Sequence, residues 1–407
     1  MRILHVSDCF PPRLGGIEVQ VDELARAQLA TGHDVVVATA TPGPRHPDAE
    51  TRTNAGSCAG AETGAGAGAE GDGGPPFPVV RLVAPLPWEL PVGRSLAPLL
   101  GELKPDVVHV HAGAVSPFAW RAVHSLGTAG TPVVLTVHSM WGPLSRSVYR
   151  ALVPGWARRH GGGLVVTTVS EAAARPIRAV VDGRLPVRVV SNGIDLSRWH
   201  AEAPSGASGK TPGKPGFQHE PDGTPHVVAV GRLAPRKEPV NLLRVLREAA
   251  SAVPLHATVV GEGPARRRME RYLRRHGMTG WVRLTGRLDR SEVRTVLETA
   301  DVFLAPAARE SFGLAALEAR LAGVPVVAQA GGGVADFVTS GREGLLGGTT
   351  RELAAALARL ASDPAMRGRI AAHNRATSPV RCSWPAVLAA FDSCYEAASE
   401  KTDLAHL

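Results

Sequence analysis

The segment Arg309–Val327 (RESFGLAALEARLAGVPVV) places two carboxylates around the start of a predicted helix. Glu310 precedes the helix, Ser311 is expected to cap it, and Gly313 would let the backbone approach a ligand closely. The N–H groups of Gly313 and the next two residues would lack helical partners and form a phosphate site. Glu318 follows about 7 Å along the helix, where a carboxylate can bind a ribose diol. Two ordinary helix carboxylates are the alternative, and the strand–helix–strand context favours the site.

A second segment, VGRLAPRKE (Val230–Glu238), directly follows a predicted strand and carries cations. Arg232 and Lys237 would lie at the carboxyl end of that strand, where open α/β sheets bind ligands. Two cations there can neutralise a diphosphate and stabilise it as a leaving group. Arg236 is expected to face solvent, and a solvated loop is the alternative for the whole segment.

Three further features follow strands in the first half of the chain. Gly15 and Gly16 precede a predicted helix, so their amides could approach an anion or a sugar, although such a pair is also common in turns. His138 follows the run Val133–Val137 and suits a structural role as well as a functional one. His109 and His111, in VVHVH, are expected to be structural or supporting.

Several patterns are missing or have plain explanations. The sequence has no D-x-D triplet, which argues against a metal–diphosphate site, and no G-x-G-x-x-G follows the first strand. The six arginines between 266 and 275 are expected to form a solvated helix face. The four cysteines show no metal-ligand spacing and are interpreted as reduced thiols of a cytosolic chain: Cys9, Cys58, Cys382 and Cys394.

Short Val-rich runs alternate with helical stretches along the chain, and these elements must position the candidate site residues named above. Runs that are apolar on consecutive positions suit parallel strands covered by helices on both faces. In the helix that begins near Ile17, Glu18 is expected only to complement the helix dipole. The expected strands are Ile3–Val6, Val35–Ala38, Val79–Val83, Val107–Val110, Val133–Val137, Leu164–Val169, Val187–Val190, Val227–Val230, Ala257–Val260, Val282–Leu284, Val302–Ala305 and Val324–Ala328.

The two series of runs predict two doubly wound α/β domains. The Gly- and Pro-rich stretch 203–225 is interpreted as a linker between domain 1–202 and domain 226–378, and 54–76 as a disordered insertion. A last helix within 379–407 carries the stripe Trp384, Leu388, Phe391 and Tyr395.

Composition fits this interpretation. The chain has 407 residues, of which 44% are hydrophobic and only 4% aromatic, so its cores must consist mainly of aliphatic side chains. The formal net charge of +8 suits anionic partners such as nucleotide diphosphates or acidic lipids. No apolar run approaches the 18 to 20 residues of a membrane span, and the N-terminus does not resemble a secretory signal.

These motifs together resemble glycosyltransferase family 4, whose members are retaining enzymes of the GT-B fold. The resemblance rests on the segments GGIEVQVDELARAQLATGHDVVV, LTVHS, SNGID, VGRLAPRKE, VGEGP, TGR and RESFGLAALEARLAGVPVV, in the family's order. It implies two Rossmann-like domains that face each other across a cleft, with the acceptor on the N-terminal side. It also implies that the last helix returns to the N-terminal domain.

The resemblance also implies a role for each matching residue. Arg232 and Lys237 would bind the donor diphosphate, Glu318 the ribose, and Glu310 would lie near the transferred sugar. His138 would lie beside the sugar. The remaining donor contacts would come from these residues: Gly15, Gly16, Gly261, Glu262, Arg287, Leu288, Phe312, Gly313, Leu314 and Ala315.

The sequence departs from the family pattern at two places. Glu238 and Pro239 stand where a glycine commonly follows the lysine, and Asp336 stands where the family often has glutamate. These departures leave the donor and acceptor preferences open.

We therefore expect a metal-independent, retaining glycosyltransferase with a nucleotide-diphosphate sugar as co-substrate and no cofactor. The acceptor could be a small molecule, a glycan or a lipid-linked molecule. No nucleic-acid partner is expected, because aromatic residues that could stack on bases are not interspersed among the basic residues. A GT-B-fold nucleotide-sugar epimerase and a non-catalytic nucleotide-sugar-binding relative are the alternatives. A cytoplasmic location is expected, with possible contact to an anionic membrane surface.

Overall fold

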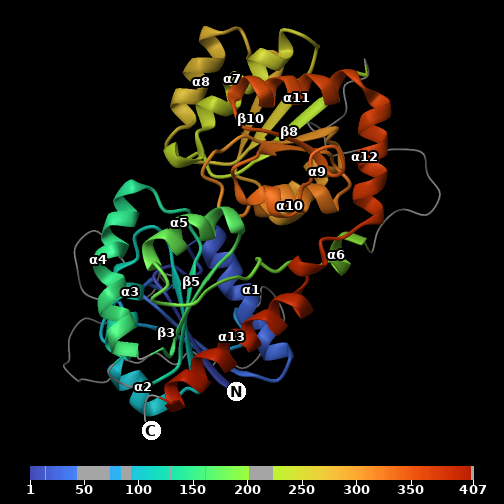
Figure 1. The fold of residues 1–407 in the computed structure, drawn as a ribbon. Helices are drawn as coiled ribbons and strands as arrows, with labels where there is room; N and C mark the ends of the chain where they lie inside the picture. The colour runs from blue at the N-terminus through green and yellow to red at the C-terminus, as the bar shows by residue number, and fades with distance from the viewer. Residues whose placement is uncertain are drawn as a thin grey trace, which may run out of the picture. The chain divides into compact units, whose positions relative to one another are not determined.

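The computed structural model describes residues 1–13, 15–43, 74–83, 93–127, 130–160, 162–200 and 223–404. They form two compact units, each built around a parallel sheet. Unit 1 comprises Met1–Gly193 and Trp384–Leu407, and unit 2 comprises Ile194–Ser383. Figure 1 shows the helices of each unit on both faces of its sheet. The chain thus belongs to the α/β class that its repeated apolar runs predicted.

The sheet of unit 1 has the strand order β3-β2-β1-β4-β5-β6-β7, and all its neighbours are parallel. Because the order reverses at β1, the strands β1 and β4 flank the switch point of a doubly wound sheet. The strands are β1 (Arg2–Ser7), β2 (Asp34–Thr39), β3 (Val79–Arg81), β4 (Val107–Ala112), β5 (Val133–Val137), β6 (Leu164–Thr168) and β7 (Val187–Val189).

Two layers of helices cover this sheet (Figure 1). Alternate strand residues such as Leu4 and Val108 pack against α3, α4 and α5, whereas Ile3 and Val107 pack against the last helix. The helices are α1 (Gly16–Ala30), α2 (Ala97–Leu103), α3 (Pro117–Leu126), α4 (Pro143–His160), α5 (Glu171–Val181) and α13 (Trp384–Leu404). On α13, the side chains of Phe391 and Tyr395 are buried in the core of unit 1.

The sheet of unit 2 has the order β10-β9-β8-β11-β12-β13 and is also parallel. Its switch point lies between β8 and β11. The strands are β8 (His226–Val230), β9 (His256–Val260), β10 (Val282–Gly286), β11 (Val302–Ala305), β12 (Val326–Gln329) and β13 (Gly344–Gly347).

Helices α7, α8 and α11 share one core with β8 and β9, and Figure 1 shows α9 and α10 on the opposite face. The bounds are α6 (Ser197–His200), α7 (Pro239–Ala250), α8 (Arg266–Arg275), α9 (Arg290–Glu298), α10 (Leu314–Leu321), α11 (Thr350–Ser362) and α12 (Pro364–Ala376). Short 3₁₀ turns lie at Pro235–Lys237, Gly333–Asp336 and Val380–Cys382.

The boundary between the units differs from the expected one. The chain enters unit 2 at Ile194, whose N–H bonds to the carbonyl of Cys382 at 2.8 Å, and it returns to unit 1 at Trp384. The expected domain boundaries at residues 202 and 378 therefore differ from those in the structure. Only an isolated β-bridge between Ile194 and Ser383 marks the crossing, and such a bridge leaves no run of apolar residues in the sequence. Most of the stretches 54–76 and 203–225 lies outside the described residues, as does Cys58.

Among the described residues, none of the helices combines the length and the apolar character that a bilayer crossing requires.

Candidate active site

The loop after β8 carries the two predicted phosphate-binding cations. Arg232 is exposed at the carboxyl end of β8, and Lys237 is half-buried at the end of the 3₁₀ turn Pro235–Lys237. Glu238 then adopts the left-handed conformation, with φ of 51°, as the N-cap residue of α7. This conformation favours glycine, which explains why the family commonly has glycine after the lysine.

Lys237 forms an ion pair with Glu310, which brings two of the predicted site residues together. Its Nζ lies 2.5 Å from Oε2 of Glu310, and the side chains keep 29% and 18% of their exposure. Lys237 comes from the loop after β8 and Glu310 from the loop after β11, so the pair lies beside the switch point. Because both side chains remain accessible, a ligand can compete for the ammonium group.

The start of α10 differs in one detail from its expected form. Gly313, with φ of 96°, is the N-cap residue, so the expectation that Ser311 occupies the cap position was wrong. A Cβ at Gly313 would lie 2.6 Å from Cγ2 of Val334, so both the conformation and the space require glycine. The N–H groups of Leu314 and Ala315 have no partner within the helix and can receive an anion.

Phe312 and Glu318 are the other predicted donor-binding residues near the start of this helix. The Phe312 side chain is buried against Phe337, with ring centroids 5.3 Å apart, so only its backbone can serve a ligand. Glu318 is half-buried on α10, in the second turn.

The loops after β9 and β10 are joined to the loop after β8. Gly261 has φ of 139°, donates its N–H to the carbonyl of Gly286 at 2.8 Å, and leaves no room for a side chain. A Cβ at Gly261 would lie 1.9 Å from the carbonyl oxygen of Gly231. These contacts hold the loops that present the predicted base-flanking residues, of which Glu262 and Arg287 are exposed and Leu288 is half-buried.

In unit 1, Gly15 and Gly16 lie at the start of α1, beyond the carboxyl end of β1. Gly16 is exposed, and Gly15 is the N-cap residue in an extended conformation. Glu18 is buried, and its Oε1 lies 3.4 Å from Nε of Arg13. Its carboxylate folds back so closely that a Cβ at Gly15 would lie 2.4 Å from Oε2, so Glu18 shapes this loop as well as complementing the helix dipole.

His138 lies one residue beyond β5 and is half-buried. Its Nε2 lies 3.0 Å from Nδ1 of His111, and both rings line a cavity of about 10 Å³, close to the volume that one water molecule requires. Burial by the surrounding protein lowers the pKa of His138 to about 4, so the ring is neutral at pH 7. A neutral imidazole has one donor and one acceptor nitrogen.

The same cavity is also lined by Gln20 and Gly193, which the sequence did not single out, and by Trp384, which was expected only as part of a packing stripe. The amide of Gln20 clamps Gly193, since its Nε2 donates to the Gly193 carbonyl at 3.2 Å and its Oε1 accepts from the Gly193 N–H at 3.1 Å. Trp384 packs so closely on Gly193 that a Cβ there would lie 2.4 Å from its ring. Nothing in a lone Gln or Trp could have indicated this role, because the contacts join segments far apart in the sequence.

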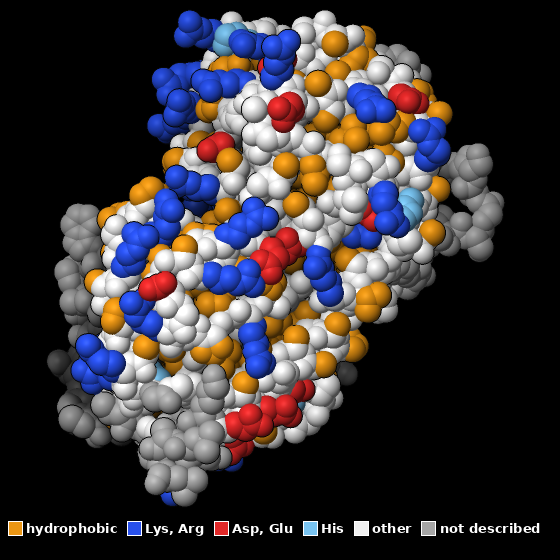
Figure 2. Space-filling model, viewed as in Figure 1, with side chains coloured by type: hydrophobic (Ala, Val, Ile, Leu, Met, Phe, Trp, Pro, Cys, Tyr) orange, Lys and Arg blue, Asp and Glu red, His pale blue; other side chains and the backbone are white. Residues whose placement is uncertain are grey.

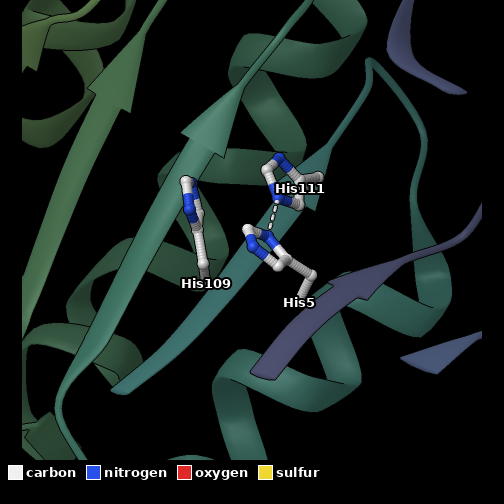
Figure 3. A group of neighbouring side chains, drawn as sticks. All are labelled: His5, His109 and His111. Atoms are coloured by element: carbon white, nitrogen blue, oxygen red, sulfur yellow. Dashed lines mark hydrogen bonds between the residues drawn. The ribbon is translucent and has the colours of Figure 1, made fainter. Parts of the chain in front are cut away.

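His5, His109 and His111 form a cluster (Figure 3), and His111 connects it to His138. One ring nitrogen from each histidine lies within 4.8 Å of the other two, which is compatible with a metal site. However, each nitrogen already has a hydrogen-bond partner among the described side chains, and His5 Nδ1 lies only 2.9 Å from His111 Nε2. The ring nitrogens are therefore engaged in hydrogen bonds to one another and to neighbouring side chains. This agrees with the structural or supporting role expected of His109 and His111.

Comparisons with known proteins agree with this arrangement. Residues 14–198 match the model described as Glycosyltransferase Family 4, and residues 214–377 match the one described as Glycosyl transferases group 1. The chain is 30% identical to the glycogen synthase of Mycobacterium tuberculosis, over 98% of this chain and 95% of the relative. It is 26% identical to a GDP-mannose-dependent monoacylated alpha-(1-6)-phosphatidylinositol monomannoside mannosyltransferase of Corynebacterium glutamicum, over 94% of each chain.

Among solved structures, the sucrose-phosphate synthase of Thermosynechococcus elongatus superposes with a TM-score of 0.71 at 20% identity, over 97% of this chain and 98% of that chain. This likeness concerns the fold. Because family models match both halves and a relative at 30% identity spans both sequences, the chain belongs to the glycosyltransferases of family 4 and is an enzyme with the GT-B fold.

Proposed function

We propose that the protein transfers a sugar from a nucleotide-diphosphate sugar to an acceptor hydroxyl, with retention of the anomeric configuration and without a metal ion. The observation that carries this proposal is that the loop after β8, which holds Arg232 and Lys237, meets the segment before α10 through the pair Lys237–Glu310 at the switch point of unit 2. Such sheets bind ligands at this point, and cations with helix amides complement a diphosphate. A relative named as GDP-mannose-dependent supports a nucleotide-sugar donor.

In this reaction, the bond between the anomeric carbon and the diphosphate oxygen breaks, and negative charge builds on the leaving group. Arg232, Lys237 and the N–H groups of Leu314 and Ala315 stabilise that charge. The acceptor oxygen forms the new bond on the face that the diphosphate leaves, and its proton goes to the departing phosphate oxygen. Glu310, which pairs with Lys237, stabilises positive charge on the sugar and does not act as a nucleophile.

The other predicted residues take the remaining roles in this proposal. Glu318 binds the ribose, and the loops of Gly261–Glu262 and Arg287–Leu288 flank the base. The amides of Gly15 and Gly16 contact phosphate, and His138 contacts a sugar hydroxyl. This last contact suits its neutral ring.

The first test compares the double variant Arg232→Ala, Lys237→Ala with Arg236→Ala. Arg236 lies in the same turn and is exposed, so it controls for a general loss of positive charge. The double variant should lose at least about 100-fold in kcat/KM, whereas Arg236→Ala should stay near the wild-type value. Near-normal turnover in the double variant would refute the assignment.

A second test uses ligand-induced thermal shifts with UDP, GDP and ADP and their sugars. A bound nucleotide raises apparent stability, and the proposal expects this shift to survive EDTA and to disappear in the double variant. Analysis of the product formed from the donor alone distinguishes transfer from epimerisation. The anomeric configuration of the glycoside, measured by NMR, tests retention.

We further propose that the protein works in the cytoplasm, at an anionic membrane surface. Cys9, Cys382 and Cys394 form no disulfide bond among the described residues, which suits a reducing compartment. Lys and Arg side chains gather over α8 (Figure 2). The exposed arginines of α8 without an ion pair among the described residues are Arg267, Arg268, Arg271, Arg274 and Arg275.

Each such cation contributes about 1 kcal/mol to binding at an anionic surface. Sedimentation with phosphatidylglycerol vesicles should show association that weakens as salt rises. Replacement of Arg267, Arg271 and Arg274 by Gln should remove it, whereas Arg351→Gln on α11 should not. Equal sedimentation with neutral vesicles would refute the membrane proposal and leave the transferase proposal intact.

A further inference from the structure

A continuous chain of hydrogen bonds connects Gln28 to His138 through the interior of unit 1. Gln28 Oε1 lies 2.7 Å from His5 Nε2. His5 Nδ1 lies 2.9 Å from His111 Nε2, the contact drawn in Figure 3, and His111 Nδ1 lies 3.0 Å from His138 Nε2. The three rings come from the same face of β1, β4 and the end of β5, and α1 supplies Gln28.

The rings in this chain are neutral. His5 and His111 are fully buried, and desolvation lowers the pKa of His5 to about 4 and that of His111 well below its usual range. A neutral ring carries one proton, so each ring donates from one nitrogen and accepts at the other. The direction of the first bond therefore fixes the direction of all the following bonds.

The side-chain amide of Gln28 sets that direction. Its Nε2 donates to the hydroxyl of Tyr395 at 2.8 Å, so its Oε1 accepts from Nε2–H of His5. The bare Nδ1 of His5 accepts from Nε2–H of His111, and the bare Nδ1 of His111 accepts from Nε2–H of His138. His138 is left with a bare Nδ1, which no described residue contacts with a hydrogen bond.

Tyr395 holds the amide of Gln28 in this orientation from the other side. Its hydroxyl accepts from Gln28 and donates to Nδ1 of His109 at 2.8 Å. His109 then donates from Nε2 to Oγ1 of Thr136 at 2.6 Å. Reversal of the chain would thus require the amide, the phenol and four imidazoles to change together.

We propose that Gln28, His5 and His111 are positioning residues that hold His138 as the Nε2–H tautomer, so that its Nδ1 accepts a hydrogen bond from a hydroxyl of the bound sugar. The role of the sugar rests on the proposed function; the tautomer does not. A bare nitrogen accepts from a hydroxyl and offers no donor to a phosphate oxygen. The relay therefore directs His138 toward the sugar part of the donor.

The test is the tautomer itself, read from long-range ¹H–¹⁵N correlations in protein labelled with ¹⁵N-histidine. In the wild-type protein at pH 7, His5, His109, His111 and His138 should all be Nε2–H forms. An Nδ1–H form at His138, or a mixture among the four rings, would overturn the proposal. This measurement needs no variant and no turnover.

The variant Gln28→Met then removes the group that sets the direction while keeping a long, unbranched side chain. His138 should become a mixture of tautomers, and the donor KM should rise about tenfold, as expected for one misdirected hydrogen bond, with a smaller change in kcat. The control is His160→Asn, which alters another buried histidine of unit 1, one that bonds the Val123 carbonyl. It should leave the His138 spectrum and the donor KM unchanged.

The outcomes separate the two proposals. An unchanged His138 tautomer in Gln28→Met would refute the relay even in an active enzyme. The expected tautomers in a protein that transfers no sugar would refute the proposed function and leave the relay intact.

Discussion

The two units place different chemistry at the carboxyl ends of their central strands. In unit 1, β4 and β5 lead to neutral, buried imidazoles joined by hydrogen bonds. In unit 2, the loops after β8 and β11 carry accessible charges, Arg232 and the pair Lys237–Glu310. Neutral hydrogen bonds depend on direction and little on salt, whereas accessible charges act over a distance and are screened. The same sheet topology thus supports a directional contact in one unit and charge neutralisation in the other.

A fall in pH should produce the largest difference between the two units, because it destabilises unit 1. The pKa of His5 and that of His138 fall to about 4, and burial lowers those of His109 and His111 well below their usual value, so the unfolded chain binds more protons below about pH 6.5. Their stabilising contribution is therefore present above about pH 6.5 and is lost as the pH falls toward 4. Between pH 7 and pH 5, His5 and His138 each lose about 2 kcal/mol, and His109 and His111 add to this loss.

Asp8 acts in the opposite direction, because burial raises its pKa to about 6 and its contribution grows as the pH falls. It offsets only part of the loss, by about 1 kcal/mol between pH 7 and pH 5. Hydrogen exchange at pH 7 and pH 5, corrected for intrinsic rates, should show β1 and β4 losing protection while β8 and β11 keep theirs. Equal losses in both units would contradict this account.

Gly261→Ala should destabilise unit 2 by about 4 kcal/mol, because the new Cβ overlaps the Gly231 carbonyl and φ of 139° is unfavourable for alanine. Urea unfolding measures the change. Gly280→Ala is the matched control, since a Cβ there has no neighbour within 4 Å, and it should change stability by less than about 0.5 kcal/mol. Similar losses in both variants would mean that the loop packing does not constrain Gly261.

Glu310→Gln should separate binding from turnover. The substitution keeps the side-chain shape and frees the Lys237 ammonium from its carboxylate partner, so nucleoside diphosphate should bind as well as before or a few-fold more tightly. Turnover should fall about 100-fold, because the sugar loses a charge that stabilises it in the transition state. Calorimetry and steady-state kinetics measure the two effects, and a parallel loss of both would show that Glu310 mainly supports the loop.

Glu238→Gly should have the smallest effect, a gain of about 0.5 to 1 kcal/mol in stability. Glycine adopts φ of 51° without the steric cost that glutamate pays there, although its greater freedom in the unfolded chain removes part of the gain. Thermal unfolding measures the change. A loss of stability would indicate that the Glu238 side chain makes a favourable contact.

Much of the fold could be predicted from the alternation of apolar runs with helical stretches. The runs that became β5 and β11 were placed at their observed bounds, since continuous Val-rich segments mark strands buried on both faces. Strand β13 (Gly344–Gly347) was not predicted, because GLLG has only two apolar residues between glycines and resembles a turn.

The charged residues of the candidate site and His138 were named from the sequence, whereas the relay behind His138 was not. Arg232, Lys237 and Glu310 stand in loops directly after predicted strands, and strand order alone brings such loops together. The relay depends on β1 lying beside β4, which pairs His5 with His109 in register, and on a helix from the far end of the chain. The one available signal was polar residues at every second position within apolar strands, as in VVHVH.

The interleaving of the two units has a consequence for synthesis. Unit 2 is a continuous segment inserted into unit 1, whose core and relay need Phe391 and Tyr395 from the last helix. During translation, the inserted unit can therefore finish folding while the earlier-made one still lacks its final layer. Until residue 395 leaves the ribosome, Gln28 and His109 lack their hydrogen-bond partner Tyr395, so a nascent chain is the form in which this interior is open to water.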